Sequence, residues 1–297
     1  MDISIVIPSH NRKASLIQLL KSIKESDTET IQFEVIVVCD GCVDGTEKEI
    51  EAFQKQFSVL KYISQKGAGP AAARNNGAKL AQGKYIAFTD DDCLVSKEWL
   101  KAIITGFSKF PKVIGLQGKT LTNKKECTPL THQIHNEAGH SAWPTCNVAY
   151  RKDYFERVGG FDESFPFAHN EDADIAWRLE KEGPMIFYSE MLIIHPPREE
   201  SFKKLSKRMK MLESEFLLYH KDAKTYKEKR NSSPWVTIYW EVFLVHQFRQ
   251  LKSRFKFIHK PKEFFLGLAL NFYWWYELIA LLPKYMAADK KYAKLYA

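Results

Sequence analysis

The feature that most constrains this chain is a regular alternation of short β-branched runs with helical patterns. Residues 3–7 and 33–38 are rich in Ile and Val, and apolar residues at helical spacing, such as Leu16, Leu19 and Leu20, follow the first run. The alternation predicts parallel β-α-β units in an α/β fold. Further elements are expected as strands near 59–63, 84–89 and 113–118 and as helices near 70–81 and 97–108.

Three polar loops follow the first, second and fourth of these strands: Pro8 to Arg12, Cys39 to Thr46 and Thr89 to Cys93. Because ligands bind beyond the carboxyl ends of parallel strands, we expect the three loops to converge on one site. The third loop carries Asp90-Asp91-Asp92, in which the outer two carboxylates point to the same side of an extended chain. Adjacent carboxylates repel one another, and a hard divalent cation shared with substrate phosphates would stabilise them. A solvated acidic turn is the alternative.

A second acidic pair, Glu171-Asp172, follows Asn170, a residue type that favours the N-cap of a helix. A carboxylate in the first helical turn is stabilised by the helix dipole and stays ionised near neutral pH. It is therefore available as a base, although acidic residues often do no more than cap a helix.

The cysteines allow two further hypotheses. Cys39-Asp40-Gly41-Cys42 has the spacing of a redox or metal motif, but Asp40-Gly41 favours a tight turn in place of the helix start that a redox pair prefers. A second set has spacings that fit no standard zinc site: Cys127, His132, His135, His140 and Cys146. Five scattered cysteines and a start without a signal-peptide pattern predict a reduced, cytoplasmic chain.

The second half of the chain differs in composition from the first. Residues 122–145 read as a long loop, which in a compact domain is more often a binding element than filler, although a surface excursion is the alternative. A strand at 146–150, a helix through Val158 and a helix from about Asn170 follow, and helices are expected from Glu199 onward. The sequence thus predicts a domain at 1–198, in halves 1–118 and 119–198, and a helical region at 199–297.

The helical region is basic and aromatic. Residues 198–297 hold 21 basic and 10 acidic side chains, against 23 and 26 in residues 1–197, and 17 aromatic residues lie within 235–297. Its apolar stretch 264–282 is interrupted by Asn271 and Glu277, which favours attachment at the surface of an anionic membrane over a span. Lys252, Arg254, Lys256 and Lys260 would add electrostatic attraction. The alternative is packing of the aromatics on the catalytic domain or on a second copy in a homodimer; nucleic acid is not expected as a partner.

Read together, these segments resemble the inverting glycosyltransferase family two, whose GT-A fold is a Rossmann-like fold for nucleotide-diphospho-sugar transfer. The resemblance covers roughly the first 200 residues. The matching segments, in order, are Ile5 to Arg12, Val37 to Thr46, Gly69 to Gly77, Gly83 to Asp92, Cys146 to Lys152, Val158 to Glu163 and Glu171-Asp172.

The resemblance also implies roles for individual residues. Asp172 would be the general base, Asp92 would bind Mg²⁺ or Mn²⁺ on the donor diphosphate, and His195 would be a further ligand. Asn147 and Glu171 would lie on the acceptor side, where we also expect residues 122–145 to form a mobile acceptor loop with Trp143 available to stack on a sugar ring. The donor-binding residues would be Pro8, Ser9, Asn11, Arg12, Asp40, Arg74, Asp90 and Asp91.

The function predicted from the sequence is non-processive transfer of a sugar from a nucleotide-diphosphate sugar, with a UDP-sugar favoured, to a glycan or lipid-linked acceptor. No Gln-x-x-Arg-Trp motif follows Glu171-Asp172, which disfavours a processive synthase. The expected setting is polysaccharide synthesis for the cell envelope, at the inner face of the cell membrane. The alternatives are a nucleotide-sugar-binding module without turnover and a thiol-redox protein that uses Cys39 and Cys42.

Overall fold

A computed structural model describes residues 1–28 and 30–297, which divide into two compact units. The division is not a single cut in the sequence, because two loop segments group with the C-terminal helices. The first unit holds Met1–Thr122, Ile134–Ser164 and Glu171–Pro196, and the second holds Asn123–Gln133, Phe165–Asn170 and Pro197–Ala297.

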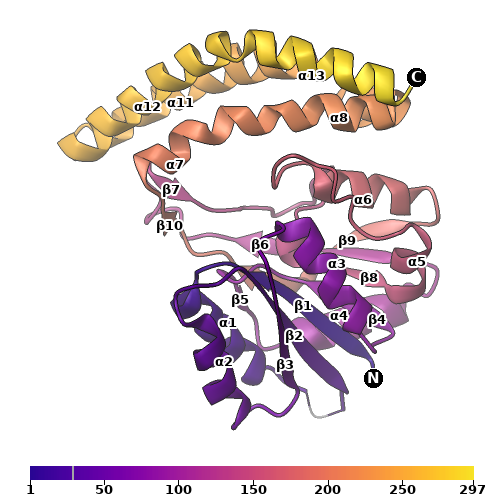
Figure 1. Ribbon diagram of the computed structural model, residues 1–297. Helices are drawn as coiled ribbons and strands as arrows, with labels where there is room; N and C mark the ends of the chain where they lie inside the picture. The colour runs from indigo at the N-terminus through magenta and orange to yellow at the C-terminus, as the bar shows by residue number, and fades with distance from the viewer. Residues whose placement is uncertain (29) are drawn as a thin grey trace. The chain divides into compact units, whose positions relative to one another are not determined.

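An eight-stranded sheet with the order β3-β2-β1-β4-β8-β6-β9-β5 forms the centre of the first unit (Figure 1). Strands β3, β2, β1 and β4 run parallel, as the alternation in the sequence predicts. Strand β8 is antiparallel to its neighbours β4 and β6, and this reversal separates the parallel half from the rest. The strand bounds are β1 Ile3–Ser9, β2 Phe33–Asp40, β3 Leu60–Gln65, β4 Tyr85–Phe88, β5 Leu94–Val95, β6 Gly115–Leu121, β8 Val148–Arg151 and β9 Met185–Ile194.

Helices cover both faces of this sheet because its central strands are apolar on both sides. Ile5 of β1 belongs to a core cluster that also includes Leu16 of α1, Ile50 of α2 and Ile103 of α4. On the opposite face α3 packs closely, since a Cβ on Gly77 would clash with Val6. The helix bounds are α1 Lys13–Lys24, α2 Thr46–Gln54, α3 Pro70–Leu80, α4 Trp99–Lys109, α5 Lys152–Arg157 and α6 Glu171–Glu180.

Strand β9, which pairs in parallel with β6, was not among the strands predicted from the sequence. Its apolar pattern is interrupted by the exposed pair Ser189-Glu190. The pairing register shifts at this point, because Gly118 lies opposite Tyr188 whereas Lys119 lies opposite Leu192. The resulting bulge breaks the alternation by which a strand is recognised in a sequence.

The second unit is mainly helical, as predicted from Glu199 onward. It also contains the short antiparallel pair β7 and β10. Within this unit α8 lies beside α13, and α11 lies beside α12 (Figure 1). Its elements are β7 Thr131–His132, β10 Arg198–Glu199, α7 Phe202–Ser206, η2 Lys207–Leu212, α8 Glu213–Lys221, α9 Ala223–Arg230, α10 Pro234–Val236, the π-helix η3 Thr237–His246, α11 Gln247–Arg254, η4 Phe255–Phe257, α12 Pro261–Ala280 and α13 Leu282–Leu295.

Among the described residues, no single helix has the length and apolar composition needed to cross a membrane. Helices α12 and α13 meet the criterion only together, as a pair bent by 51°.

Candidate active site

Three loops meet at the carboxyl ends of β1, β2 and β4. The side-chain oxygen of Asn11 accepts a hydrogen bond of 2.7 Å from the backbone N–H of Val43, which ties the first loop to the second. The hydroxyl of Ser9 donates to Asp91 at 2.8 Å, which ties the first loop to the third. The predicted convergence of the three loops is therefore confirmed.

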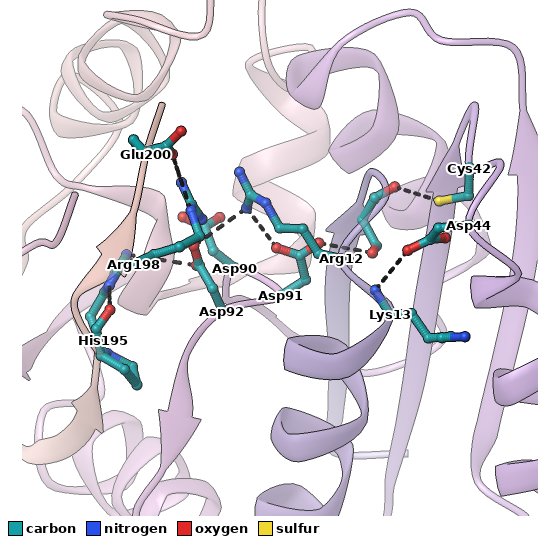
Figure 2. Close-up of polar contacts among 12 residues, drawn as sticks. Arg12, Lys13, Cys42, Asp44, Asp90, Asp91, Asp92, His195, Arg198 and Glu200 are labelled. Atoms are coloured by element: carbon teal, nitrogen blue, oxygen red, sulfur yellow. Dashed lines mark hydrogen bonds and ion pairs between the residues drawn. The ribbon is translucent and has the colours of Figure 1, made fainter. Parts of the chain in front are cut away.

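Asp91 is the inward-facing member of the acidic triplet, and it is 1% exposed. Its carboxylate accepts from Ser9 and, at 2.7 Å, from the Arg12 guanidinium (Figure 2). Burial raises the pKa of Asp91, although the hydrogen bonds from Arg12 and Ser9 oppose the shift. In this geometry Asp91 anchors the Pro8 to Arg12 loop, so any contribution to donor binding passes through Ser9 and Arg12.

Asp92 faces His195, which ends up beside the triplet because it follows β9. His195 Nε2 lies 3.6 Å from Asp92 Oδ1. Among the described residues, the one group of at least three His, Cys or acidic side chains whose ligand atoms lie within 4.8 Å of one another is Asp92, Cys93 and His195. Figure 2 shows Asp92 between His195 and Arg12, and the Arg12 guanidinium lies 3.4 Å from Asp92 Oδ2.

The donor chemistry of this group fits a divalent cation. His195 is 1% exposed, and burial lowers its pKa, which favours the neutral imidazole that metals require. Its Nδ1 lies 3.2 Å from the carbonyl oxygen of Pro196, an arrangement that places the proton on Nδ1 and the lone pair on Nε2, toward Asp92. Burial raises the pKa of the Cys93 thiol, so the carboxylate and the imidazole are the better ligands for Mg²⁺ or Mn²⁺.

Arg74 connects the acidic triplet with the second acidic pair. It is 5% exposed, and its two terminal nitrogens lie 2.9 Å from Asp90 Oδ1 and 3.2 Å from Glu171 Oε1. Burial acts to raise the pKa of Asp90, but the charge of Arg74 and smaller effects of His195 and Arg12 together lower it. Arg74 thus holds the loop after β4 and the start of α6 next to each other.

Asp172 lies in the first turn of α6 with its side chain partly exposed. Burial acts to lower the pKa of Arg74, but the charges of Asp90, Glu171 and Asp172 raise it. Burial and, next, the charge of Asp172 raise the pKa of Tyr150. The other end of α6 is anchored by Arg178, which donates to the carbonyl oxygens of Val158 at 2.6 Å and of Gly160 at 2.8 Å. Asp172 is thus a partly accessible carboxylate on a fixed helix, beside the Arg74 cluster.

Asp40 stabilises the loop that leads into α3. Its carboxylate accepts hydrogen bonds from the Gln65 side chain at 2.8 Å and from the backbone N–H groups of Ala68 at 2.7 Å and Gly69 at 2.9 Å. Residues 65–69 were not among the predicted site residues. The sequence Gly67-Ala68-Gly69, which begins two residues after the end of β3, is the signal that could have indicated them.

Two predicted acceptor residues point inward. Asn147 is 1% exposed, accepts a hydrogen bond from the Trp99 indole and donates to the carbonyl oxygens of Lys119 and Met191, so it joins strands of the sheet. Trp143 is 6% exposed, and the face expected for sugar stacking is therefore not open in this structure.

Asn170, expected as an N-cap, has a φ of 73°, outside the extended region typical of capping residues.

The cysteine hypotheses are not supported by the geometry. Burial raises the pKa of the Cys39 thiol to about 12, whereas a redox-active pair needs a lowered thiol pKa. Within residues 1–28 and 30–297, the set of Cys127, His132, His135, His140 and Cys146 forms no cluster with metal-ligand spacing.

Comparison with protein families identifies the chain. The model of "Glycosyl transferase family 2" matches residues 4–164, more than half of the sequence. The chain belongs to this family. It is 27% identical over 238 residues to a validoxylamine A glucosyltransferase of Streptomyces hygroscopicus subsp. jinggangensis, a match that covers 67% of this chain and 56% of the relative. The chain thus spans about half the length of the curated relatives that it matches first.

Solved structures show the fold of this family 2 member. The structure of Staphylococcus aureus TarS 1-349 in complex with UDP matches with a TM-score of 0.60 and 20% identity, covering 99% of this chain and 89% of that one. The mannosyltransferase PcManGT from Pyrobaculum calidifontis, in complex with GDP-Man and Mn²⁺, matches with a TM-score of 0.61 and 18% identity, covering 98% and 86%. The predicted GT-A fold with a helical C-terminal region is confirmed.

Proposed function

We propose that this family 2 member transfers a sugar from a nucleotide-diphosphate sugar to an acceptor hydroxyl, with inversion at the anomeric carbon and without processive movement. The observation that carries the proposal is the Arg74 bridge, which joins Asp90 of the acidic triplet to Glu171, the neighbour of Asp172. Donor-side and acceptor-side carboxylates thereby belong to one cluster. Catalysis of glycosyl transfer needs these two parts close together.

On the donor side, Asp92 and His195 would hold Mg²⁺ or Mn²⁺, which when bound acts as a Lewis acid for the diphosphate leaving group. Arg12 lies beside Asp92, where its positive charge would attract the donor phosphates. Asp90 and Arg74 would position the nucleotide end of the donor. Asp40 would hold the loop at residues 65–69 against the nucleobase of the donor. The polar side chains of the Pro8 to Arg12 loop would contact the same part of the donor.

On the acceptor side, Asp172 would act as the general base. Its carboxylate takes the proton of the acceptor hydroxyl while that oxygen forms a bond to the anomeric carbon. The bond from the anomeric carbon to the diphosphate oxygen breaks, and the nucleoside diphosphate leaves with the electron pair. Attack from the face opposite the leaving group inverts the configuration. Glu171 would support Asp172 through the Arg74 cluster.

The donor is proposed to be a UDP-sugar. TarS has been solved with UDP and with UDP-GlcNAc, whereas PcManGT has been solved with GDP-Man. The test is incubation of the chain with Mn²⁺ and a panel of nucleotide sugars, with release of nucleoside diphosphate followed over many turnovers. Release that needs Mn²⁺ supports an enzyme; tight donor binding with no turnover for any acceptor supports the alternative of a binding module.

We also propose that the helical unit attaches the enzyme to an anionic membrane surface, where a lipid-linked acceptor for envelope polysaccharide would be found. Exposed aromatic residues of α11 and α12 support this: Phe248 is 58%, Phe272 is 59% and Tyr276 is 67% exposed. Exposed Lys252, Lys256, Lys260 and Lys262 lie in the same stretch of the chain. Trp and Tyr favour the lipid headgroup level, and each basic residue adds about 1 kcal/mol of attraction near an anionic surface.

Two side chains of the basic and aromatic region are not available to a membrane surface. Arg254 is 5% exposed and donates to Asn271 at 2.9 Å, so it stabilises the helical unit and is not available to lipid. Trp274 is 7% exposed and its indole donates to the carbonyl oxygen of Leu205. Trp274 therefore packs within the helical unit itself, which differs from the expected alternative of packing on the catalytic domain or on a second copy.

The membrane proposal is tested by co-sedimentation of the full chain with phosphatidylglycerol vesicles at low and high salt. A variant with Lys252, Lys256 and Lys260 changed to Gln should lose binding, while a matched variant with Lys290, Lys291 and Lys294 of α13 changed to Gln should keep it. Equal binding of both variants contradicts the proposal. A concentration-dependent increase in mass without vesicle binding would favour a homodimer through these helices.

A further inference from the structure

The residues just before the proposed catalytic helix belong to the helical unit. Segment Phe165–Asn170 groups with the C-terminal helices, although the next residue, Glu171, is the first of α6 in the other unit. The guanidinium of Arg230, at the end of α9, donates to the side-chain oxygen of Asn170 at 3.0 Å. Because Asn170 is bonded directly to Glu171, a contact that restrains Asn170 also restrains the start of α6.

Glu215 of α8 completes this contact. It is 2% exposed, and its Oε1 lies 3.3 Å from His169 Nε2 and 3.8 Å from the Arg230 guanidinium. The hydroxyl of Tyr226 donates to the other oxygen of the carboxylate at 2.8 Å. Burial acts to raise the pKa of Glu215, but His169, Arg230 and Asn170 lower it to about 2, so the carboxylate is ionised at neutral pH.

The other end of the segment is held as well. The ammonium group of Lys221 lies 5.4 Å from the centre of the Phe165 ring, and that of Lys284 lies 5.3 Å from the centre of the Phe167 ring. Both distances are within the range of cation–π attraction. Contacts from three helices of the unit, α8, α9 and α13, thus restrain the whole segment.

Asn170 also has an unusual backbone. Its φ of 73° lies in the left-handed region, which non-glycine residues adopt only when the surroundings hold them there. A residue with this conformation sets the direction in which the chain enters α6. Release of its side chain would allow the backbone to relax and the first turn of α6 to shift.

We infer that Arg230 and Glu215 are positioning residues for sugar transfer: through Asn170 they fix the first turn of α6 and hence the carboxylate of Asp172. The inference rests on the proposed function, in which Asp172 is the base. A displacement of the base by about 1 Å can reduce the rate on the order of 100-fold.

The test compares four variants of the full chain: Arg230→Met, Asn170→Gly, the double variant and the control Lys229→Met. Asn170→Gly removes only the side-chain acceptor, because glycine tolerates the left-handed backbone. It therefore remains informative if Arg230→Met unfolds through loss of the partner of Glu215. The measurements are kcat, the Kd of the donor, the melting temperature, and hydrogen exchange of the amides at residues 171–174.

Each single variant is expected to lower kcat at least about tenfold while the donor Kd stays within about twofold. Amide exchange in the first turn of α6 should become faster, and the double variant should be no worse than the more impaired single variant, because both break the same contact. The control should match the wild type. Unchanged exchange in Asn170→Gly, or additive losses in the double variant, overturn the inference. Absence of transfer by the wild type, with faster exchange in the variants, counts against the proposed function and leaves the contact itself established.

Discussion

Substitution of Arg74 by Met should destabilise the protein strongly and in a pH-dependent manner. The guanidinium is 5% exposed and pairs with Asp90 at 2.9 Å and with Glu171 at 3.2 Å. Removal of one partner from a buried ion pair costs about 3–5 kcal/mol, because the remaining charge is left without compensation. The Asp90 side chain is 24% exposed, and water can therefore stabilise part of its charge. We expect a loss at the lower end of that range, about 3 kcal/mol at pH 7.

The pH dependence follows from the sign of the shift. In the wild type the pKa of Asp90 is lowered, so its ionised form adds stability that is present above its unfolded pKa of about 3.9 and is lost as the pH falls through the folded value. Without Arg74, burial of Asp90 raises its pKa, and protonation at mildly acidic pH removes the unfavourable charge. The difference in stability between wild type and variant should therefore shrink as the pH falls from 7 toward 4.

The assay is urea denaturation of both proteins at several pH values. The control is Arg157→Met, because the guanidinium of Arg157 lies 3.5 Å from Glu182 but is 54% exposed, and loss of such a surface pair costs less than about 1 kcal/mol. A loss of less than about 1 kcal/mol for Arg74→Met, or a difference that does not change with pH, would refute this account of the cluster.

Three further predictions concern the metal site, the packing of α3 and the cysteines. In Asp92→Asn, binding of Mn²⁺ with a nucleoside diphosphate should weaken at least about tenfold, as measured by electron paramagnetic resonance, because a charged ligand is lost; unchanged binding argues against the site. Gly77→Ala should cost about 1–3 kcal/mol in denaturation experiments, because the new methyl group clashes with Val6 and also lies 3.1 Å from Val38 Cγ2; a neutral result contradicts the packing described for α3. Iodoacetamide should modify Cys42 in the native protein and spare Cys39, whose thiol pKa is raised to about 12 by burial; peptide mass spectrometry that finds equal rates contradicts this.

The parallel half of the sheet could be predicted from the sequence because its signals are local. Ile3, Ile5, Val6 and Ile7 form a short run rich in β-branched residues, and Leu16, Leu19, Leu20 and Ile23 repeat with helical spacing; these four helical side chains are fully buried. The antiparallel reversal at β8 and the bulged strand β9 depend on pairing between distant segments. No local pattern encodes that pairing.

The acidic residues of the site could be recognised because they are adjacent in the sequence. The residues that pair with them could not be recognised, because they are distant in the sequence. The triplet Asp90-Asp91-Asp92 is visible in the sequence, but the direction of Asp91 depends on Ser9 and Arg12, about 80 residues earlier. The Arg74 partner Glu171 is 97 residues away. An amide that resembles a binding group in the sequence, such as that of Asn147, can instead donate hydrogen bonds to buried backbone carbonyl oxygens. Only the fold distinguishes a ligand-binding amide from a structural one.

The central claim is that Asp172 is the base that serves a donor site formed by separate residues. Its most direct test is the rate of sugar transfer and the donor affinity of Asp172→Asn, compared with the wild type and with Asp153→Asn, which makes the same change at an exposed position of α5. Loss of a general base is expected to lower kcat by about 10²–10⁴-fold, while the donor Kd and the melting temperature stay close to wild-type values and Asp153→Asn keeps full activity. Transfer by Asp172→Asn at the wild-type rate would contradict the account.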